Sequence, residues 1–550
     1  MLREFIDQLD KLPQKIMANC MEIATDKPLI GIISAQNEIS TAHKNLDELC
    51  QRVKEGILSS GASAKLAHVA SIDCTALHGT QSTKYDLPSR DLTANAVELL
   101  CSNDFFDGLV FVASEPNIVV GMLLGAIRLN IPCAFVCEGT MTPIVYKGKE
   151  HGFAHFYEQI VKIKTGRTPY ETISEIEASL PLALGTDCER YGANSFNCLL
   201  EAVGLAVRGN GTAPAMSVER KNIAYKTGEL AVQLANEKCA PKRLLNSSSL
   251  HNLAVLDMAC GGSSTTMLNL IALAKELGIK SFNFKTVGDV GKNTPLLLSC
   301  ENANGCIMPQ FHNAGGVYAM LKQLLDAKLI KGDVAVNDGS TLADMVKDVT
   351  VTNQDVIRPV SNFVASSSKL RVIFGNVAED GALIHYQPNN ETAFVGPAKV
   401  YSNEEMAIDA LLHREIRKGD VIVIRGEGPK SGPGMREIFS SLALLRGFDL
   451  ENKVAVITDG RISDFYNGIV VGHITPETGE QNLFSVLQDG DEIEINVAKG
   501  KINCDIKAKE LAQRYRDSDT GVGNYGNFFI KNWAKTCSTA VEGCVYKSKK

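Results

Sequence analysis

The chain has 550 residues, a formal net charge of −7 and a hydrophobic content of 45%. This length exceeds what one hydrophobic core usually supports, so two domains are expected. A net negative charge and a pI near 5.9 leave no basic surface for nucleic acid. The sequence holds no apolar run near the ~20 residues of a membrane helix and begins without the apolar core of a secretion signal. We therefore expect a cytoplasmic protein that binds neither nucleic acid nor membrane.

From about residue 28, strand-like runs alternate with helical patterns. PLIGIIS (28–34) precedes a helical stretch over 42–61, and GLVFVAS (108–114) is followed by a second helix and then by PCAFVCE (132–138). This alternation predicts βαβ units and a parallel sheet with ligands at the carboxyl ends of its strands. Residues 192–235 and 253–278 are rich in helical patterns.

The pattern changes after residue 365. Short strands separated by Gly and Asp turns follow one another, among them KLRVIFGN, GALIHY, DVIVIRGEG and KVAVITDG. Such spacing favours a β-rich, barrel-like second domain. We therefore divide the chain into a first domain over 1–365 and a second over 366–550. The fifteen cysteines are scattered without a CxxC pair, so reduced thiols are expected rather than a disulfide framework.

Two loops stand where α/β enzymes place their chemistry. Glu115-Pro116-Asn117 lies between a buried strand and a helix. GEGPKSGPGM (426–435) follows the strand DVIVIR, and its glycines would let backbone amides approach an anion closely. Its spacing is not that of a P-loop, and a tight turn explains the same residues. These features indicate a two-domain α/β protein and favour an enzyme.

Several long strings resemble the dihydroxy-acid dehydratase and phosphogluconate dehydratase family, in the family's order and from about residue 28 onward. They are YDLPSR, GMLLGAIRLNIP, GANSFNCLLEAVGLAVRGNGTAPA, AGGVYAMLKQLLDAKLIKGD, GDVIVIRGEGPKSGPGMREI and AVITDGRISDFYNGIVVGHITPE. The resemblance implies an N-terminal three-layer α/β domain, a C-terminal β-barrel-like domain, a homodimer and a small hydroxy acid as substrate. It also implies that glycine loops of the second domain close over the strand ends of the first.

The family removes water from 2,3-dihydroxy acids. The resemblance implies that an Fe–S cluster takes the C3 oxygen, that magnesium holds the carboxylate and C2 hydroxyl, and that a serine alkoxide removes the C2 proton. The serine of the family's TDGRFSG matches Ser463 in TDGRISD, and its magnesium glutamate matches Glu427. The candidate substrate-binding residues are Lys430, Ser431, Gly432, Gly434 and Ser263.

The other metal-binding positions depart from the family pattern. The three cluster cysteines fall on Ala42, Glu115 and Asp187, the remaining magnesium aspartates on Cys74 and Pro116, and the carbamylated lysine on Asn117. A shift of one residue would bring in the sulfurs of Cys74 and Cys188, but it supplies none at Glu115. Carboxylates and a methyl group do not replace thiolates around iron and sulfur. An Fe–S cluster is therefore not expected.

Two hypotheses follow. In the first, the protein is a hydro-lyase that has changed metal. Glu115, Asp187 and His43 hold one divalent ion (Mg²⁺, Mn²⁺ or Fe²⁺), Glu427 and Cys74 mark the former magnesium site, and Ser463 remains the base. In the second, the protein is a non-catalytic descendant that serves as a ligand sensor, a scaffold or an inactive subunit. Ser463 then caps a turn, Glu115 is a solvated loop acid and Cys74 is a small hydrophobe.

Overall fold

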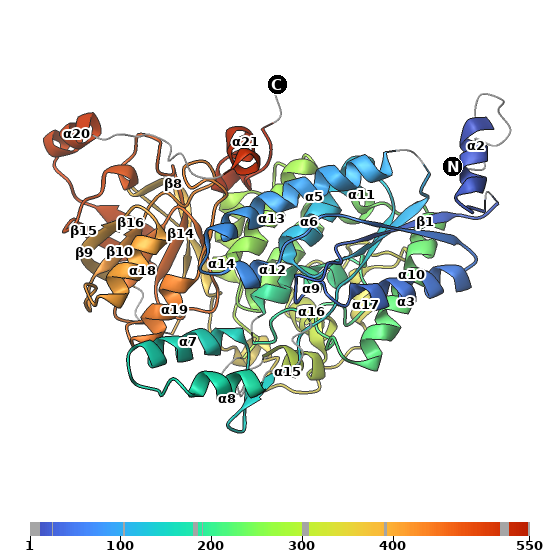
Figure 1. Cartoon of the computed structure of the whole chain (residues 1–550), viewed down its shortest axis with the longest axis horizontal. Helices are drawn as coiled ribbons and strands as arrows, with labels where there is room; N and C mark the ends of the chain where they lie inside the picture. Colours follow the sequence, from blue (N-terminus) through green and yellow to red (C-terminus); the bar gives the residue numbers. More distant parts are fainter. Residues whose placement is uncertain are drawn as a thin grey trace.

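The computed structural model describes residues 12–24, 26–102, 105–179, 185–189, 191–299, 307–389, 393–517 and 527–547. It contains a parallel sheet surrounded by helices and, further along the chain, a β-barrel (Figure 1). Among these residues, no helix combines the length and the apolar character that crossing a membrane requires.

The first sheet of the described chain has four parallel strands in the order β2-β1-β3-β4. They are β1 (Leu29–Ser34), β2 (Ser63–His68), β3 (Gly108–Val112) and β4 (Cys133–Val136). Every residue of β1, β3 and β4 is buried, because helices cover both faces of a parallel sheet. The predicted alternation of strands and helices is confirmed.

Two helix pairs enclose this sheet and make three layers. α3 (Leu46–Ser59) and α10 (Val218–Asn236) lie on the side of β1 opposite to α5 (Asp86–Cys101) and α6 (Pro116–Leu129) (Figure 1). Glycines let α3 and α10 approach closely, since a Cβ on Gly56 would lie 2.0 Å from the Tyr225 carbonyl oxygen. The three-layer α/β prediction is confirmed.

More helices extend the first part of the chain, as the helical patterns over 192–235 and 253–278 predict. The longer ones are α2 (Leu12–Cys20), α7 (Phe153–Lys164), α8 (Thr172–Ser179), α9 (Ser195–Ala202), α12 (Ser247–Ala259), α13 (Ser264–Glu276), α14 (Phe284–Asn293), α15 (Ile307–Asn313) and α16 (Gly316–Asp326). The shorter elements are α4 (Cys74–Leu77), η2 (Gln81–Tyr85), β5 (Ile144–Tyr146), β6 (Lys149–His151), η3 (Gly192–Asn194), α11 (Pro241–Leu244), α17 (Leu342–Val346) and η4 (Val360–Asn362).

Eight strands of the described residues close into a barrel in the order β10-β12-β14-β8-β7-β16-β15-β9. They are β7 (Leu370–Gly375), β8 (Ala378–His385), β9 (Ala393–Tyr401), β10 (Val421–Ile424), β12 (Ala455–Thr458), β14 (Val470–Thr475), β15 (Glu492–Asn496) and β16 (Lys501–Cys504). The remaining elements are α18 (Glu404–Leu412), β11 (Glu437–Ile438), α19 (Ser440–Gly447), β13 (Arg461–Ile462), η5 (Phe484–Val486), α20 (Ala508–Asp517), α21 (Phe528–Thr536) and η6 (Ala540–Glu542). The barrel prediction is confirmed, whereas the boundary at residue 366 stays a prediction.

The segment after the barrel returns to the first part of the chain. α21 lies beside α13 and α5 in Figure 1. The Trp533 indole donates to Asp91 of α5 over 2.7 Å, and the Arg90 guanidinium donates to the carbonyl oxygens of Gly543 and Cys544. Residues 528–547, which the sequence groups with the second domain, therefore contact the first.

Candidate functional site

A cavity of about 60 Å³ lies at the carboxyl end of β3, which we call the strand-end cavity. The N-termini of α6 and α13 border it, and β11 and β13 close it from the second part of the chain. Elements of the second part thus close over the strand ends, but they are β11 and β13 rather than the glycine loop that the resemblance implies. The residues whose side chains matter below are Cys74, Asp86, Glu115, Asp187, Ser263, Glu437, Arg461 and Asp464.

Glu115 and Cys74 form a hydrogen-bonded pair in this cavity. Glu115 stands at the N-cap of α6 and is buried, and the Cys74 thiol donates to its Oε2 over 2.6 Å. Burial and the nearby Asp73 carboxylate raise the pKa of Glu115 well above its usual range. Burial and the Glu115 carboxylate likewise raise the pKa of the Cys74 thiol. The pair therefore favours holding protons over carrying negative charge.

Asp187 and Asp464 bring two more carboxyl groups to the cavity from opposite parts of the chain. Asp187 is buried, and its Oδ1 accepts from the Glu189 amide over 2.9 Å. Asp464 lies so close to Gly192 that a Cβ there would be 1.6 Å from its Oδ2. Glycine at 192 is thus required to make room for this carboxylate. Asp187 and Cys74 line the cavity and Cys188 is not among the described lining residues, so the one-residue shift finds no support at Cys188.

Arg461 is the sole lysine or arginine among the described residues that line the cavity. Its guanidinium contacts Asp86 at 2.6 Å and Glu437 at 3.5 Å, and it also donates to the Met435 carbonyl oxygen. Five carboxyl groups of the described chain line the cavity against this one cation. Carboxyl groups thus outnumber cationic groups within the described lining.

His43 is buried behind the cavity rather than in it. Its Nε2 accepts from the backbone amides of Ser114 (3.2 Å) and Glu115 (3.4 Å), and its Nδ1 lies 3.2 Å from the Ser71 hydroxyl. Burial lowers the pKa of His43 to about 4, so the ring is neutral. Both ring nitrogens are engaged, which leaves none facing an ion. His43 is absent from the described lining to which Asp187 belongs, and its place beside Asp187 stays a prediction. Its bonds fix the backbone beneath Glu115.

Glu427 is also outside the described lining of the cavity, and the chain provides its counter-ions. Its carboxylate lies 3.6 Å from the Lys84 ammonium and 3.7 Å from the Arg436 guanidinium, and it accepts from the Glu404 amide. Burial raises the pKa of Glu427 to about 7, although both cations oppose this shift. Arg436 is fully buried and also pairs with Glu404 at 2.7 Å. Glu427 thus belongs to a closed ion network.

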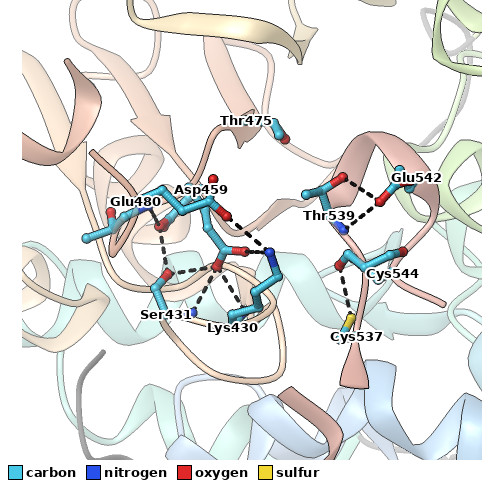
Figure 2. A network of polar contacts seen from close by, with 12 residues as sticks. Lys430, Ser431, Asp459, Thr475, Glu480, Cys537, Thr539, Glu542 and Cys544 are labelled. Carbon is cyan, nitrogen blue, oxygen red and sulfur yellow. Dashed lines mark hydrogen bonds and ion pairs between the residues drawn. The ribbon is translucent and has the colours of Figure 1, made fainter. Parts of the chain in front are cut away.

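The glycine loop, residues 426–435, directs its backbone amides at a carboxyl group, and that group is the chain's own Glu477. The amides of Lys430 and Ser431 each donate to Glu477 Oε2 over 2.9 Å. The Ser431 hydroxyl donates to the same oxygen and to Asp459 (Figure 2). Both interpretations of the loop are therefore partly realised: it is a tight turn whose amides face a carboxylate. Burial raises the pKa of Glu477 to about 7.

The glycines of this loop permit close backbone approach. A Cβ on Gly434 would lie 2.1 Å from the Lys84 carbonyl oxygen, and one on Gly432 would lie 2.7 Å from Glu427. Neither these glycines nor Lys430 and Ser431 belong to the described lining of the strand-end cavity. Four of the predicted substrate-binding residues thus stabilise the loop itself.

Of the three predicted serines, Ser263 lines the cavity, Ser431 lies in the glycine loop, and Ser463 adjoins two lining residues. Ser263 also caps α13, its hydroxyl accepting from the Thr266 amide, while its own amide donates to the buried Asp257. Ser463 is buried between Ile462 and Asp464, which both line the cavity. The sequence analysis did not predict Asp86 or Asp464 as site residues. Asp464 could have been found, because it directly follows the predicted base Ser463.

Comparison with known proteins matches most of the chain to one family. Residues 27–345 match the family described as dihydroxy-acid/6-phosphogluconate dehydratase N-terminal, and residues 355–544 match its C-terminal counterpart. The chain belongs to the dihydroxy-acid/6-phosphogluconate dehydratase family. A dihydroxy-acid dehydratase of Desulfitobacterium hafniense is 36% identical over 515 residues, covering 92% of this chain and 91% of the relative. One of Pyrococcus abyssi is 33% identical over 545 residues, or 98% of each chain.

The donor atoms of this family member do not fit the two metal groups that the resemblance implies. Where three thiolates would hold a cluster, the chain has the methyl group of Ala42 and the carboxyl groups of Glu115 and Asp187. Glu427 faces Lys84 and Arg436 instead of an ion. No group of three His, Cys, Asp or Glu side chains arranged for a metal occurs among the described residues.

Proposed function

We propose that this family member is a hydro-lyase that removes water from a sugar acid or another 2,3-dihydroxy acid. We further propose that one divalent ion, Mg²⁺, Mn²⁺ or Fe²⁺, takes the place of an Fe–S cluster. The observation that carries the proposal is the strand-end cavity, where the carboxyl groups of Glu115, Asp187 and Asp464 converge from three separate segments. Carboxylate oxygens suit hard divalent ions.

In this proposal each nearby residue has a defined task. Glu115 and Asp187 are the two proposed protein ligands of the ion, and water or substrate oxygens complete its coordination. Cys74 donates its thiol proton to Glu115 when no ion is present, and His43 keeps the Glu115 backbone in place. When bound, the ion supplies a Lewis acid toward the hydroxyl that leaves. Ser463 remains the candidate base for the C2 proton.

Metal analysis tests the ligand set. We expect wild type to retain one divalent ion per chain, and Glu115→Ala and Asp187→Ala to lose it, because a site with few protein ligands depends on each. Glu201→Gln is the matched control: Glu201 is another buried carboxylate, but the amides of Gly209 and Gly211 hold it. Equal metal content in wild type and Glu115→Ala would disprove the ligand assignment. A brown protein with acid-labile sulfide would disprove the absence of the cluster.

Proton exchange tests the chemistry. Wild type in deuterium oxide, supplied with each divalent metal, should exchange the C2 proton of a sugar acid or a branched dihydroxy acid. Ser463→Ala should stop this exchange and leave ligand binding nearly intact, because a general base contributes about 10²–10⁴ in rate and acts in the transition state. NMR follows both.

The second candidate is a non-catalytic descendant that binds a hydroxy acid. The pairing of Glu427 with Lys84 and Arg436 favours it, because the chain has neutralised a carboxylate that the family uses for metal. A thermal shift with hydroxy acids but no exchange of any C2 proton would select this candidate. The homodimer and the cytoplasmic location are predictions as well, and light scattering after size exclusion tests the first.

A further inference from the structure

Three sulfur atoms meet in the core beside the glycine loop. The Cys544 thiol lies 3.4 Å from the Met435 thioether sulfur, and burial together with this neighbouring thiol raises the pKa of the Cys537 thiol. Figure 2 shows Cys537 and Cys544 next to each other, close to the network of Ser431 and Asp459. Met435 comes directly after the loop, so two distant parts of the chain supply the three sulfurs.

The surroundings of these sulfurs are apolar. Met435, Cys537 and Cys544 are all buried, and they share one hydrophobic cluster with Leu87, Leu268 and Trp533. The Cys537 thiol donates to the Ser538 carbonyl oxygen over 3.2 Å. Hard ions prefer oxygen ligands, whereas soft ions prefer thiolate and thioether sulfur. The donor set therefore selects a soft ion.

The backbone holds the sulfurs in place. Met435 (φ 52°) and Cys544 (φ 50°) both adopt the left-handed conformation, which costs free energy for any residue with a side chain. Backbone hydrogen bonds from Ser538 to Val545 and from Cys544 to Thr539 close the turn that carries the two cysteines. The three sulfurs are thus positioned by the fold rather than by flexible side chains alone.

A buried ion pair lies next to the sulfurs. The Arg90 guanidinium donates to the carbonyl oxygens of Gly543 and Cys544 and pairs with Asp91 at 3.3 Å. Two thiolates around a monovalent ion carry one net negative charge. Thiolate and thioether donors favour the soft ion Cu⁺.

We propose that Met435, Cys537 and Cys544 form a three-sulfur site for a soft monovalent cation, Cu⁺, separate from the strand-end cavity. Both thiols lose their protons to solvent as the ion binds, so one Cu⁺ and two thiols give a complex with one negative charge and two protons. No electron is transferred. The Met435 carbonyl oxygen accepts from Arg461 over 2.9 Å, so the site borders the cavity through one residue.

Anaerobic titration of the reduced full-length protein with Cu⁺ against bicinchoninate tests the proposal. We expect one tightly held Cu⁺ per chain. Cys537→Ser and Cys544→Ser should each weaken binding by more than the roughly 10–100-fold that loss of an outer-shell partner costs. Met435→Leu, which keeps the volume but removes the sulfur, should weaken it by about tenfold. Cys504→Ser and Cys20→Ser are matched controls, one buried and one exposed, and should bind as wild type does.

A second measurement guards against variants that fail to fold. X-ray absorption on wild type loaded with one Cu⁺ should show sulfur neighbours alone. Oxygen or nitrogen neighbours, unchanged affinity in Met435→Leu, or Cu⁺ binding that survives removal of both thiols would each overturn the site. The site would also be overturned if the reduced protein held no Cu⁺ while incubation with glutathione disulfide formed a disulfide between Cys537 and Cys544.

Discussion

The strand-end cavity and the glycine loop both bury carboxyl groups at strand ends, but they offset the charge differently. In the loop, Glu477 faces the amides of Lys430 and Ser431, and Glu427 faces Lys84 and Arg436. In the cavity, five carboxyl groups of the described residues face Arg461. Both loop carboxyl groups thus have fixed partners from the chain, whereas carboxyl groups outnumber the cation in the described lining of the cavity.

The pKa alone does not separate the two regions. Burial raises the pKa of Glu115 in the cavity and of Glu427 and Glu477 in the loop. What differs is the partner: a thiol proton for Glu115, but cations or backbone amides for the other two. A perturbed carboxyl group thus points to a binding site only when the chain leaves its charge without a fixed counterpart.

The largest expected effect comes from breaking the closed network around Glu427. Arg436→Met removes the buried cation that pairs with Glu404 and Glu427. Because two buried carboxylates then lose a partner, we expect unfolding to need about 3–5 kcal/mol less. Urea denaturation measures this, with the exposed Lys499→Met as the control. A loss below about 1 kcal/mol, the value for an exposed pair, would contradict the closed network.

The second prediction concerns pH. Glu477 has a pKa of about 7 in the fold and 4.5 as its ordinary value, so the folded state keeps a proton that the unfolded state releases. Stability from this group is full below pH 4.5 and falls as pH rises to about 7, by up to about 1.4 kcal/mol per pH unit. The urea midpoint should fall less steeply with pH in Glu477→Gln than in wild type across this range. Identical slopes would show that Glu477 does not titrate as the fold implies.

The third prediction concerns the strand-end cavity. The Glu115 carboxylate helps to raise the pKa of the Cys74 thiol, so Glu115→Gln should increase the thiolate fraction of Cys74. Each unit of lowered pKa makes alkylation by iodoacetamide about tenfold faster. Peptide mapping by mass spectrometry gives the rate, and Cys101, whose pKa is raised to about 12 by burial alone, should not change. Equal rates for Cys74 in both proteins would contradict the pairing.

The smallest effect is expected at Lys430. Its ammonium lies 3.1 Å from Glu480 and 3.8 Å from Glu477, and the side chain remains partly exposed. Lys430→Met should lower the free energy of unfolding by only about 0.2–1 kcal/mol, because solvent screens such pairs. Thermal and urea unfolding measure it. If the same variant abolishes binding of a hydroxy acid, Lys430 contacts substrate after all, and the loop is less closed than we infer.

Sequence patterns predicted the architecture because it depends on local periodicity. The buried strand 108–112, the helix after Glu115 and the barrel strands all follow from runs of apolar residues and turn residues. Glu115 and Asp187 were also found from sequence, by their places in recognisable strings. The partners were not: Lys84 reaches Glu427, and Glu477 reaches Ser431, from segments that no local pattern connects. The direction of the His43 side chain could not be predicted either, because adjacency to Ala42 does not fix it.

The bonds from Arg90 to the carbonyl oxygens near residue 543 also constrain the order of events during synthesis. Gly543 follows Arg90 by 453 residues. At the usual rate of about 5–20 residues per second, a ribosome needs roughly 20–90 s to make that stretch. During this time the guanidinium, fully buried in the finished protein, has to remain in water or against a chaperone. The first half of this protein therefore cannot complete its core while the barrel is still being translated.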